Sequence, residues 1–240
     1  MLDCNYTDNG ECVAIISHGV TSNHHRPYLN ILNDALSIEG ISTLSFTFSG
    51  NGQSEGNFSD STISKEVNDL SSILDFIGNR PSIYIGHSMG AAVGLKLASK
   101  DQRLKGLVSL AGMINVKEFF DKQFGKLSIG DLMMDREGCP LSQQILEDAR
   151  EIGTLTHLAD KINIPLLFVH GDKDELVPIQ DSIDMAEASG TETHLVSLSG
   201  CDHKFEGYYE MLVEAVVPLS LIHISEPTRR TPISYAVFCL

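Results

Sequence analysis

The sequence has few basic residues, no closely paired cysteines and no long hydrophobic runs. Its 240 residues include 17 Lys and Arg against 32 Asp and Glu, which gives a formal net charge of −15. Such acidity argues against nonspecific binding to nucleic acid or to an anionic membrane. The five cysteines form no C-x-x-C pair and no evident ligand set, so we expect reduced thiols, no metal and no cofactor.

No hydrophobic run reaches membrane-spanning length, and the first residues, MLDCNYTDNGEC, are too polar for a signal peptide. These observations predict a cytoplasmic protein that acts on a small molecule and binds neither nucleic acid nor membrane. They do not predict its oligomeric state.

The end of the sequence resembles translated adapter DNA. Leu219–Arg229 reads LSLIHISEPTR and Ile233–Leu240 reads ISYAVFCL, and both strings match, in the correct order, the translation of a transposase-type sequencing adapter. We therefore predict that the natural sequence stops near Pro218 and that residues 219–240 are not native. Residues 1–218 are then expected to form a single domain.

Short apolar segments alternate with amphipathic ones along most of the chain. The amphipathic segments carry apolar residues three and four positions apart, which indicates helices, and the short β-branched or aromatic runs indicate strands. The predicted strands are residues 12–17, 41–48, 83–85, 104–110, 166–169 and 194–198. This alternation is typical of an α/β fold with a mostly parallel sheet and helices on both faces.

The alternation breaks between Ala111 and Ile164, where the sequence is apolar but interrupted by glycines. An insertion at this point would lie over the carboxyl ends of the strands, where open α/β sheets bind ligands. We interpret residues 112–163 as a small lid insertion of about three helices, and the alternative is an irregular crossover within the core.

Residues 86–90, GHSMG, stand between a predicted strand and a helix of small residues. They fit the pattern G-x-S-x-G, in which a serine occupies a sharp strand-to-helix turn and glycines let strand and helix approach closely. The helix N-terminus beneath the serine favours developing negative charge. We therefore interpret Ser88 as a nucleophile; the alternative is a plain Gly/Ser turn.

A serine hydroxyl needs a neighbouring base, and that base needs a carboxylate to orient it. Two downstream loops each follow a predicted strand, HGDKDELVP at residues 170–178 and SGCDHKF at residues 199–205. The carboxyl ends of parallel strands meet at one edge, so both loops should lie beside Ser88. The second loop offers His203 as the base, with Asp202 capping or orienting the loop.

The first loop offers a choice of acids. Asp172, Asp174 and Glu175 all follow the strand closely enough to reach the base. Asp172 can be interpreted as a turn residue bonded to its own backbone, and Glu175 as a solvated charge.

The other histidines have structural interpretations. His24 and His25 are predicted to be polar turn residues near the mouth of the site, and His18 and His170 to be positional residues at strand ends. His157 and His194 are interpreted as surface or core residues. No H-x-x-x-H or carboxylate spacing indicates a metal site.

Taken in order, the segments HGV, FTFSGNGQSEG, GHSMG, HGDKDELVP and GCDHKF resemble the α/β-hydrolase superfamily, over about residues 13–217. The similarity is greatest to its cinnamoyl/feruloyl-esterase-like and serine-aminopeptidase-like branches. It implies an α/β-hydrolase fold, and it favours Asp174 as the acid, because the family's acid loop reads G-x-x-D-x-x-V-P. His203 matches the histidine of the family's D-H-x-F segment.

Two departures from the family pattern stand out. Thr47 occupies a position where many relatives carry Asp in F-x-F-x-G-x-G. Many relatives also have one or two further strands before the first strand predicted here, and Met1–Glu11 is expected to be too short to hold them.

A tetrahedral oxyanion needs two backbone N–H donors. The residue after the nucleophile, Met89, would supply one of them. The loop after the first strand, His18-Gly19-Val20, would supply the other at Val20.

We therefore predict an enzyme, a serine hydrolase that cleaves carboxylic esters through Ser88, His203 and Asp174 and an acyl-enzyme intermediate. The Phe and Met residues of the predicted lid suggest small to medium or aromatic acyl groups, because such side chains line adaptable pockets. One alternative is an aminopeptidase, amidase or acyltransferase that uses the same residues. Another is a non-catalytic binding module with this fold.

Aminopeptidase action would be favoured by acidic residues in the lid that bind a substrate amine. The candidates are Glu118, Asp121, Asp131 and Asp135. A run of charges is more commonly a solvated surface.

Overall fold

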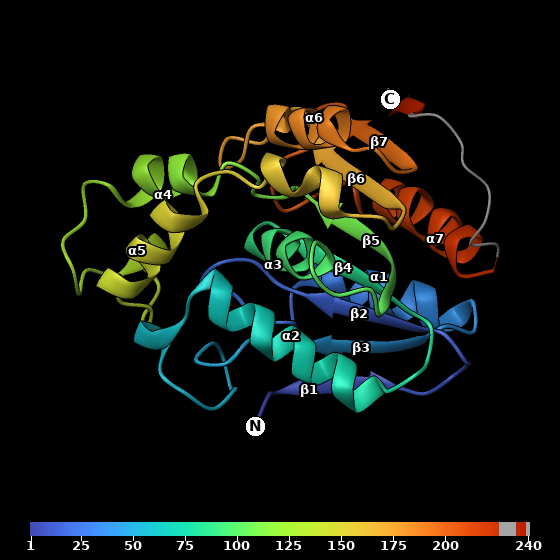
Figure 1. The fold of residues 1–240 in the computed structure, drawn as a ribbon, viewed down its shortest axis with the longest axis horizontal. Helices are drawn as coiled ribbons and strands as arrows, with labels where there is room; N and C mark the ends of the chain where they lie inside the picture. Colours follow the sequence, from blue (N-terminus) through green and yellow to red (C-terminus); the bar gives the residue numbers. More distant parts are fainter. Residues whose placement is uncertain (226–233, 239–240) are drawn as a thin grey trace.

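The computed structural model describes residues 1–225 and 234–238, with side chains up to residue 218. Its centre is a sheet in the order β1-β3-β2-β4-β5-β6-β7-β8, in which β1 is antiparallel to β3 and the other neighbours are parallel (Figure 1). The strands are β1 (Cys4–Thr7), β2 (Val13–Ser17), β3 (Ser42–Phe46), β4 (Ser82–His87), β5 (Leu104–Leu110), β6 (Leu166–Gly171), β7 (Thr193–Leu198) and β8 (Ser234–Phe238). The predicted α/β class and mostly parallel sheet are confirmed.

Helices cover both faces of the sheet. The α-helices are α1 (Pro27–Ile38), α2 (Ile63–Ile77), α3 (Met89–Ala98), α4 (Val116–Phe124), α5 (Gln143–Ile152), α6 (Ile179–Ala188) and α7 (Tyr209–Ser225). Helices α1 and α7 pack together on one face, whereas α2, α3 and α6 cover the other (Figure 1).

Strand β2 shows why the strands read as continuous apolar runs. Ala14 and Ile16 belong to the core cluster under α1 and α7, whereas Val13 and Ile15 belong to the cluster under α2 and α3. Successive side chains point to opposite faces of a sheet, so a strand covered on both sides needs apolar residues at every position.

The start of the chain corrects one expectation. Residues Cys4–Thr7 form the edge strand β1, paired with β3 in the register Cys4↔Phe46 to Thr7↔Thr43. The prediction that Met1–Glu11 is too short for a further strand is therefore wrong. An antiparallel edge strand needs only one partner, so a short segment can form one.

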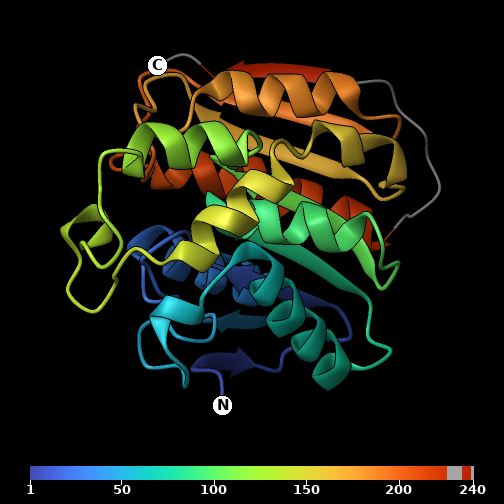
Figure 2. The same ribbon diagram turned by 60° about the vertical axis from the view of Figure 1, so that its left-hand side comes forward.

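The insertion between β5 and β6 holds α4, α5 and two 3-10 helices, Met133–Asp135 and Thr156–Lys161. Figure 1 shows α4 and α5 beside the sheet, and Figure 2 shows the segment between them as a loop that extends from one side of the molecule. The sequence predicted about three helices here. Whether the segment acts as a lid stays a prediction.

The phenylalanines of this insertion belong to the core. Phe119, Phe120 and Phe124 are each less than 7% exposed, and their ring centroids lie 5.3–6.0 Å apart. These edge-to-face and tilted contacts help to hold α4 in place, which removes much of the basis for predicting an aromatic acyl group from them.

The end of the described chain continues beyond the predicted natural terminus. Helix α7 runs through Pro218 to Ser225, and β8 pairs with β7. Residues 226–233 and 239–240 lie outside the described part, so the non-native origin of residues 219–240 stays a prediction. No helix among the described residues has the length and hydropathy needed to cross a membrane.

Candidate active site

Ser88 occupies the turn between β4 and α3. Its backbone has φ 53° and ψ −115°, a conformation that costs energy for a residue with a Cβ. Flanking hydrogen bonds hold it there: the Ser88 N–H donates to the Leu110 carbonyl at 2.9 Å, and the Met113 N–H donates to the Ser88 carbonyl at 3.2 Å. The serine therefore sits on the sharp strand-to-helix turn that its motif predicts.

The glycines around Ser88 are required by close packing. A Cβ at Gly86 would lie 2.6 Å from the backbone of Gly90, and a Cβ at Gly90 would lie 2.5 Å from the His18 carbonyl oxygen. A Cβ at Gly19 would lie 2.9 Å from the Ser88 Cβ. The loop after β2 is therefore packed directly against the proposed nucleophile.

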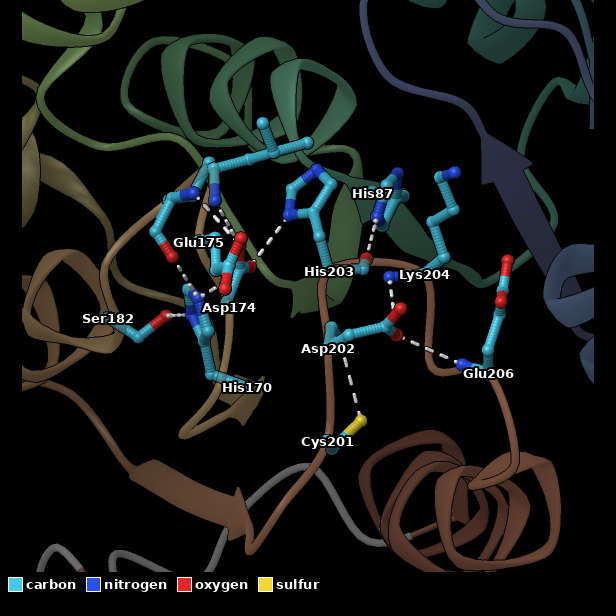
Figure 3. A network of polar contacts seen from close by, with 12 residues as sticks. His87, His170, Asp174, Glu175, Ser182, Cys201, Asp202, His203, Lys204 and Glu206 are labelled. Carbon is cyan, nitrogen blue, oxygen red and sulfur yellow. Dashed lines mark hydrogen bonds and ion pairs between the residues drawn. The ribbon is translucent and has the colours of Figure 1, made fainter.

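Asp174 and His203 are joined by a hydrogen bond of 2.6 Å between Oδ2 and Nδ1 (Figure 3). The other carboxylate oxygen accepts hydrogen bonds from the Leu176 and Val177 N–H groups, both at 2.9 Å. The Asp174 side chain is fully buried. Of the three acids that the sequence left open, Asp174 is the one that contacts the histidine.

The surroundings of Asp174 favour its ionised form. Burial alone would raise the pKa of Asp174, but hydrogen bonds from His170 and His203, the charge of His203 and the Val177 N–H hold that pKa well below its usual range. The carboxylate therefore remains charged at neutral pH and fixes the proton of His203 on Nδ1.

His170 contacts Asp174 and the backbone of its loop. Its Nε2 lies 3.2 Å from Asp174 Oδ2 and 3.0 Å from the Val177 carbonyl oxygen, while its Nδ1 lies 2.8 Å from Ser182 Oγ. Because a carbonyl can only accept, Nε2 carries a proton and donates it toward Val177, while the Ser182 hydroxyl contacts Nδ1. The sequence predicted a positional role for His170, and these contacts confirm it.

His87 supports the loop that carries His203. Its Nε2 lies 2.9 Å from the His203 carbonyl oxygen, and its Nδ1 lies 3.0 Å from the Tyr28 hydroxyl (Figure 3 shows the first contact). Burial lowers the pKa of His87 well below its usual value, with the nearby His203 as a smaller cause. His87 is therefore neutral, donates from Nε2 and accepts from Tyr28.

Sequence reasoning assigns no role to His87 or Tyr28. His87 stands at the variable position of the serine motif, and Tyr28 reads as an apolar position of α1. Only the packing of α1 against the sheet brings the two together.

His87 lies between Ser88 and His203: it precedes Ser88 in the chain, and its ring contacts the ring of His203. The rings of His87 and His203 have their centroids 4.7 Å apart, and His87 directly precedes the serine. Among the side chains of residues 1–218, no hydrogen bond joins the Ser88 hydroxyl to His203. Catalytic hydrogen bonds are often long without substrate and tighten in the complex.

Two backbone N–H groups beside Ser88 are available as donors. Met89 is the first residue of α3, and Val20 follows the glycine that packs against Ser88. In the part of the chain that the structure describes, neither the Met89 N–H nor the Val20 N–H donates to another protein atom. Both groups predicted for the oxyanion hole are thus unoccupied, and their role stays a prediction.

The three other acidic residues of these two loops, Asp172, Glu175 and Asp202, have different contacts. Asp172 does not bond its own turn as predicted: its Oδ1 accepts from the Gly200 N–H at 2.7 Å, which ties the acid loop to the His203 loop. Asp202 accepts from two N–H groups that follow it in the chain, as expected of a capping residue. Glu175 is exposed, as predicted.

The acidic residues of the insertion do not form a binding cluster. Glu118, Asp121, Asp131 and Asp135 are all exposed. Asp121 pairs with Lys117 at 2.6 Å, and Asp131 accepts a hydrogen bond from the Ser128 N–H. These contacts favour the solvated interpretation over an amine-binding one.

His24 lies in a turn, as predicted. It is nevertheless only 2% exposed, and its Nδ1 lies 2.8 Å from the Thr47 hydroxyl oxygen. Thr47 therefore supports the loop after β2 from the position where many relatives carry Asp. His25 is exposed, as a turn residue should be.

Three features define the α/β-hydrolase class: a mostly parallel sheet, a strained serine between a strand and a helix, and a histidine–aspartate pair on the loops after β7 and β6. The family model described as "Serine aminopeptidase, S33" matches residues 9–133. The chain belongs to this family of hydrolases.

Curated relatives carry a different enzymatic description. The chain is 28% identical over 201 residues to a mitochondrial palmitoyl-protein thioesterase ABHD10 of Pongo abelii, a match that covers 75% of this chain and 65% of that protein. It is also 28% identical over 199 residues to the human protein of the same name, with 74% and 64% covered. The match thus spans slightly less than two thirds of the length of these relatives.

Solved structures share the fold. The ferulic-acid complex of Est1E from Butyrivibrio proteoclasticus has a TM-score of 0.80 at 23% identity and covers 94% of this chain and 96% of its own. Alpha/beta hydrolase domain-containing protein 10 from mouse has a TM-score of 0.77 at 22% identity, with 91% and 93% covered.

Proposed function

We propose that the protein is a serine hydrolase that cleaves carboxylic esters, with Ser88 as nucleophile, His203 as general base and Asp174 as the group that orients it. The observation that carries this proposal is the Asp174–His203 hydrogen bond, held against the elbow that presents Ser88. Family membership supports the hydrolase class, and the fold of Est1E supports it further.

In the proposed mechanism each group takes one step. His203 Nε2 takes the proton of Ser88 as the hydroxyl attacks the acyl carbon, while Asp174 stabilises the imidazolium through Nδ1. The Val20 and Met89 N–H groups donate to the oxyanion. His203 then protonates the leaving alcohol. In the second half of the reaction His203 takes a proton from water, the water attacks the acyl-enzyme, and the proton returns to Ser88 as the carboxylic acid leaves.

Thioester hydrolysis is the second candidate, because the curated relatives are thioesterases. The same groups would serve, since a thiolate is a better leaving group than an alkoxide and asks less of His203 as an acid. Amide hydrolysis has weaker support, because the acidic residues of the insertion are exposed and do not gather into an amine site.

The first experiment treats the protein with a fluorophosphonate probe and compares Ser88→Ala with Ser72→Ala, an exposed serine of α2. We expect labelling of the parent and of Ser72→Ala, and none of Ser88→Ala. Circular dichroism of each protein checks folding. A folded parent that takes no label would contradict the proposal and favour a binding module.

Substrate class is then measured with a butyryl ester, the matching butyryl thioester and an aminoacyl p-nitroanilide. We expect kcat for the butyryl p-nitrophenyl ester and for the matching thioester to fall by about 10⁶-fold in Ser88→Ala. Faster cleavage of the thioester at equal acyl chain would favour the second candidate. Preferential cleavage of an aminoacyl p-nitroanilide would contradict ester specificity while preserving the catalytic residues.

A further inference from the structure

A second cluster of histidine and aspartate lies outside the proposed active site. Asp3 directly precedes β1, and His24 and His25 belong to the loop between β2 and α1. Asp3 Oδ2 lies 3.7 Å from His24 Nδ1 and 3.9 Å from His25 Nε2. These three atoms all lie within 4.8 Å of one another, and the two imidazole rings have their centroids 3.9 Å apart.

The Asp3 carboxylate has an unused oxygen inside this cluster. Asp3 Oδ2 is inaccessible to solvent, and in the described part of the chain it makes no hydrogen bond. Both histidine nitrogens are too distant for a hydrogen bond to it. A buried polar atom without a partner is uncommon and points to a missing ligand.

The spacing of the three atoms suits a metal ion between them. Nitrogen and oxygen ligands lie about 2.0–2.2 Å from Zn²⁺, which places two ligands of a tetrahedral site roughly 3.3–3.6 Å apart. The separations of 3.7 and 3.9 Å between Asp3 Oδ2 and the two nitrogens need to shorten by only a few tenths of an ångström. The two nitrogens lie within 4.8 Å of each other, and rotation of the exposed His25 side chain would bring them closer. His25 is 61% exposed at its side chain, so it leaves an entry path and room for water ligands.

We propose that Asp3, His24 and His25 bind a divalent transition-metal cation, with Zn²⁺ as the representative ion. Two imidazoles and one carboxylate form a donor set of the kind that Zn²⁺ and its neighbours prefer, and water completes the coordination. When His24 Nδ1 binds the cation, the Thr47 hydroxyl loses its contact with that nitrogen. It still accepts the hydrogen bond from the His24 backbone N–H at 3.2 Å.

The cation would join the start of the sheet edge to the loop after β2. Asp3 is already held there, since its N–H donates to Ser54 Oγ and its carbonyl accepts from the Thr47 N–H, both at 2.9 Å. The histidines belong to the loop after β2, which also carries Val20, so the cation would fix that loop without touching the reacting atoms. A ligand that binds only the folded state raises its stability by mass action.

The experiment uses the whole chain after removal of metal with a chelator. Isothermal titration with ZnCl₂ and thermal unfolding with and without ZnCl₂ are compared for the parent, His25→Ala and Asp3→Asn. His157→Ala is the matched control, because His157 is also exposed and lies in the 3-10 helix Thr156–Lys161. A Cys4→Ser variant tests whether the neighbouring exposed thiol is the ligand instead.

The expected result is one Zn²⁺ per chain with an increase in melting temperature. Loss of a supporting residue around a metal already costs about 10–100-fold in affinity, so loss of a ligand in His25→Ala should cost at least about 100-fold. His157→Ala and Cys4→Ser should bind as the parent does. The proposal is wrong if the parent binds no Zn²⁺, if His25→Ala binds as tightly as the parent, or if Cys4→Ser abolishes binding.

Discussion

Two histidine–aspartate pairs of this protein differ in how their carboxylates are supported. In the proposed active site, Asp174 Oδ2 lies 2.6 Å from His203 Nδ1, and Asp174 Oδ1 accepts two backbone N–H groups. Near the N-terminus, Asp3 Oδ2 lies 3.7 Å from His24 Nδ1 and accepts no hydrogen bond from any described residue. The first carboxylate has its acceptor sites filled and orients an imidazole; the second retains capacity for a cation.

The difference follows from the local backbone. Asp174 lies in a tight loop after β6, so the N–H groups two and three residues later turn back to it. Asp3 lies in an extended segment that leads into β1, where successive N–H groups point away from the side chain. A carboxylate in a turn can be satisfied by its own loop, and one in an extended segment needs a partner from elsewhere.

The largest effect on activity is expected for Asp174→Asn. An amide in place of the carboxylate stabilises the wrong tautomer of His203 and cannot stabilise its charged form, so we expect kcat to fall by about 10⁴-fold. The exposed neighbour Glu175→Gln is the control and should stay within a few-fold of the parent. Steady-state rates on the ester substrate decide the matter, and equal rates for the two variants would remove Asp174 from the mechanism.

A smaller effect is expected at His87, which supports the other side of the His203 loop. His87→Phe retains a ring but leaves the His203 carbonyl without its 2.9 Å hydrogen bond. Misplacement of a catalytic group by about 1 Å can cost about 10²-fold, so we expect kcat to fall by about 10–100-fold with little change in KM. Tyr28→Phe removes only the outer hydrogen bond and should lose less. A rise in KM at constant kcat would contradict a positioning role.

His18 is a buried histidine that has no carboxylate partner among the described residues; its ring nitrogens contact the Gly19 carbonyl and the Phe48 N–H. Burial lowers its pKa from 6.5 to about 4, whereas the unfolded chain binds the proton near pH 6.5. Between these values the unfolded state holds more protons, so stability falls as pH decreases from 6.5 to 4, by up to about 1.4 kcal/mol per pH unit for one group.

Urea unfolding at pH 7 and pH 5 measures this slope. His18→Gln should lower stability at pH 7, yet lose less on acidification than the parent. The buried His87 keeps part of the slope, since its pKa is lowered in the same direction. His157→Gln, at an exposed position, should leave the slope unchanged. An unaltered slope in His18→Gln would show that this histidine does not cause the acid sensitivity.

The smallest effect is expected for Asp172→Asn. This exposed carboxylate joins the acid loop to the His203 loop through the Gly200 N–H at 2.7 Å. The amide oxygen can keep the hydrogen bond without its charge, so we expect a loss of about 0.5–1.5 kcal/mol in stability and only a few-fold in kcat. Thermal unfolding and ester turnover measure both, and a loss as large as that of Asp174→Asn would mean that the sequence-based choice between the two acids was wrong.

The sequence located the proposed site through local signals. Ser88 was identified from glycines that a strand-to-helix turn requires, and His203 from its place after a predicted strand. The choice of Asp174 needed the family resemblance, because three acids stood within the same loop. His87 and Tyr28 were missed, since their contact depends on how α1 packs against the sheet.

By itself the sequence determined the alternation of strands and helices, the class of fold, and the loops that carry Ser88, Asp174 and His203. These features depend on local periodicity and on turn residues, which neighbouring positions encode. Only the tertiary structure decided that Cys4–Thr7 is an edge strand, that Phe119, Phe120 and Phe124 are core residues, and that Asp3 stands beside His24 and His25. Those outcomes depend on contacts between segments distant in the chain, and no local pattern records them.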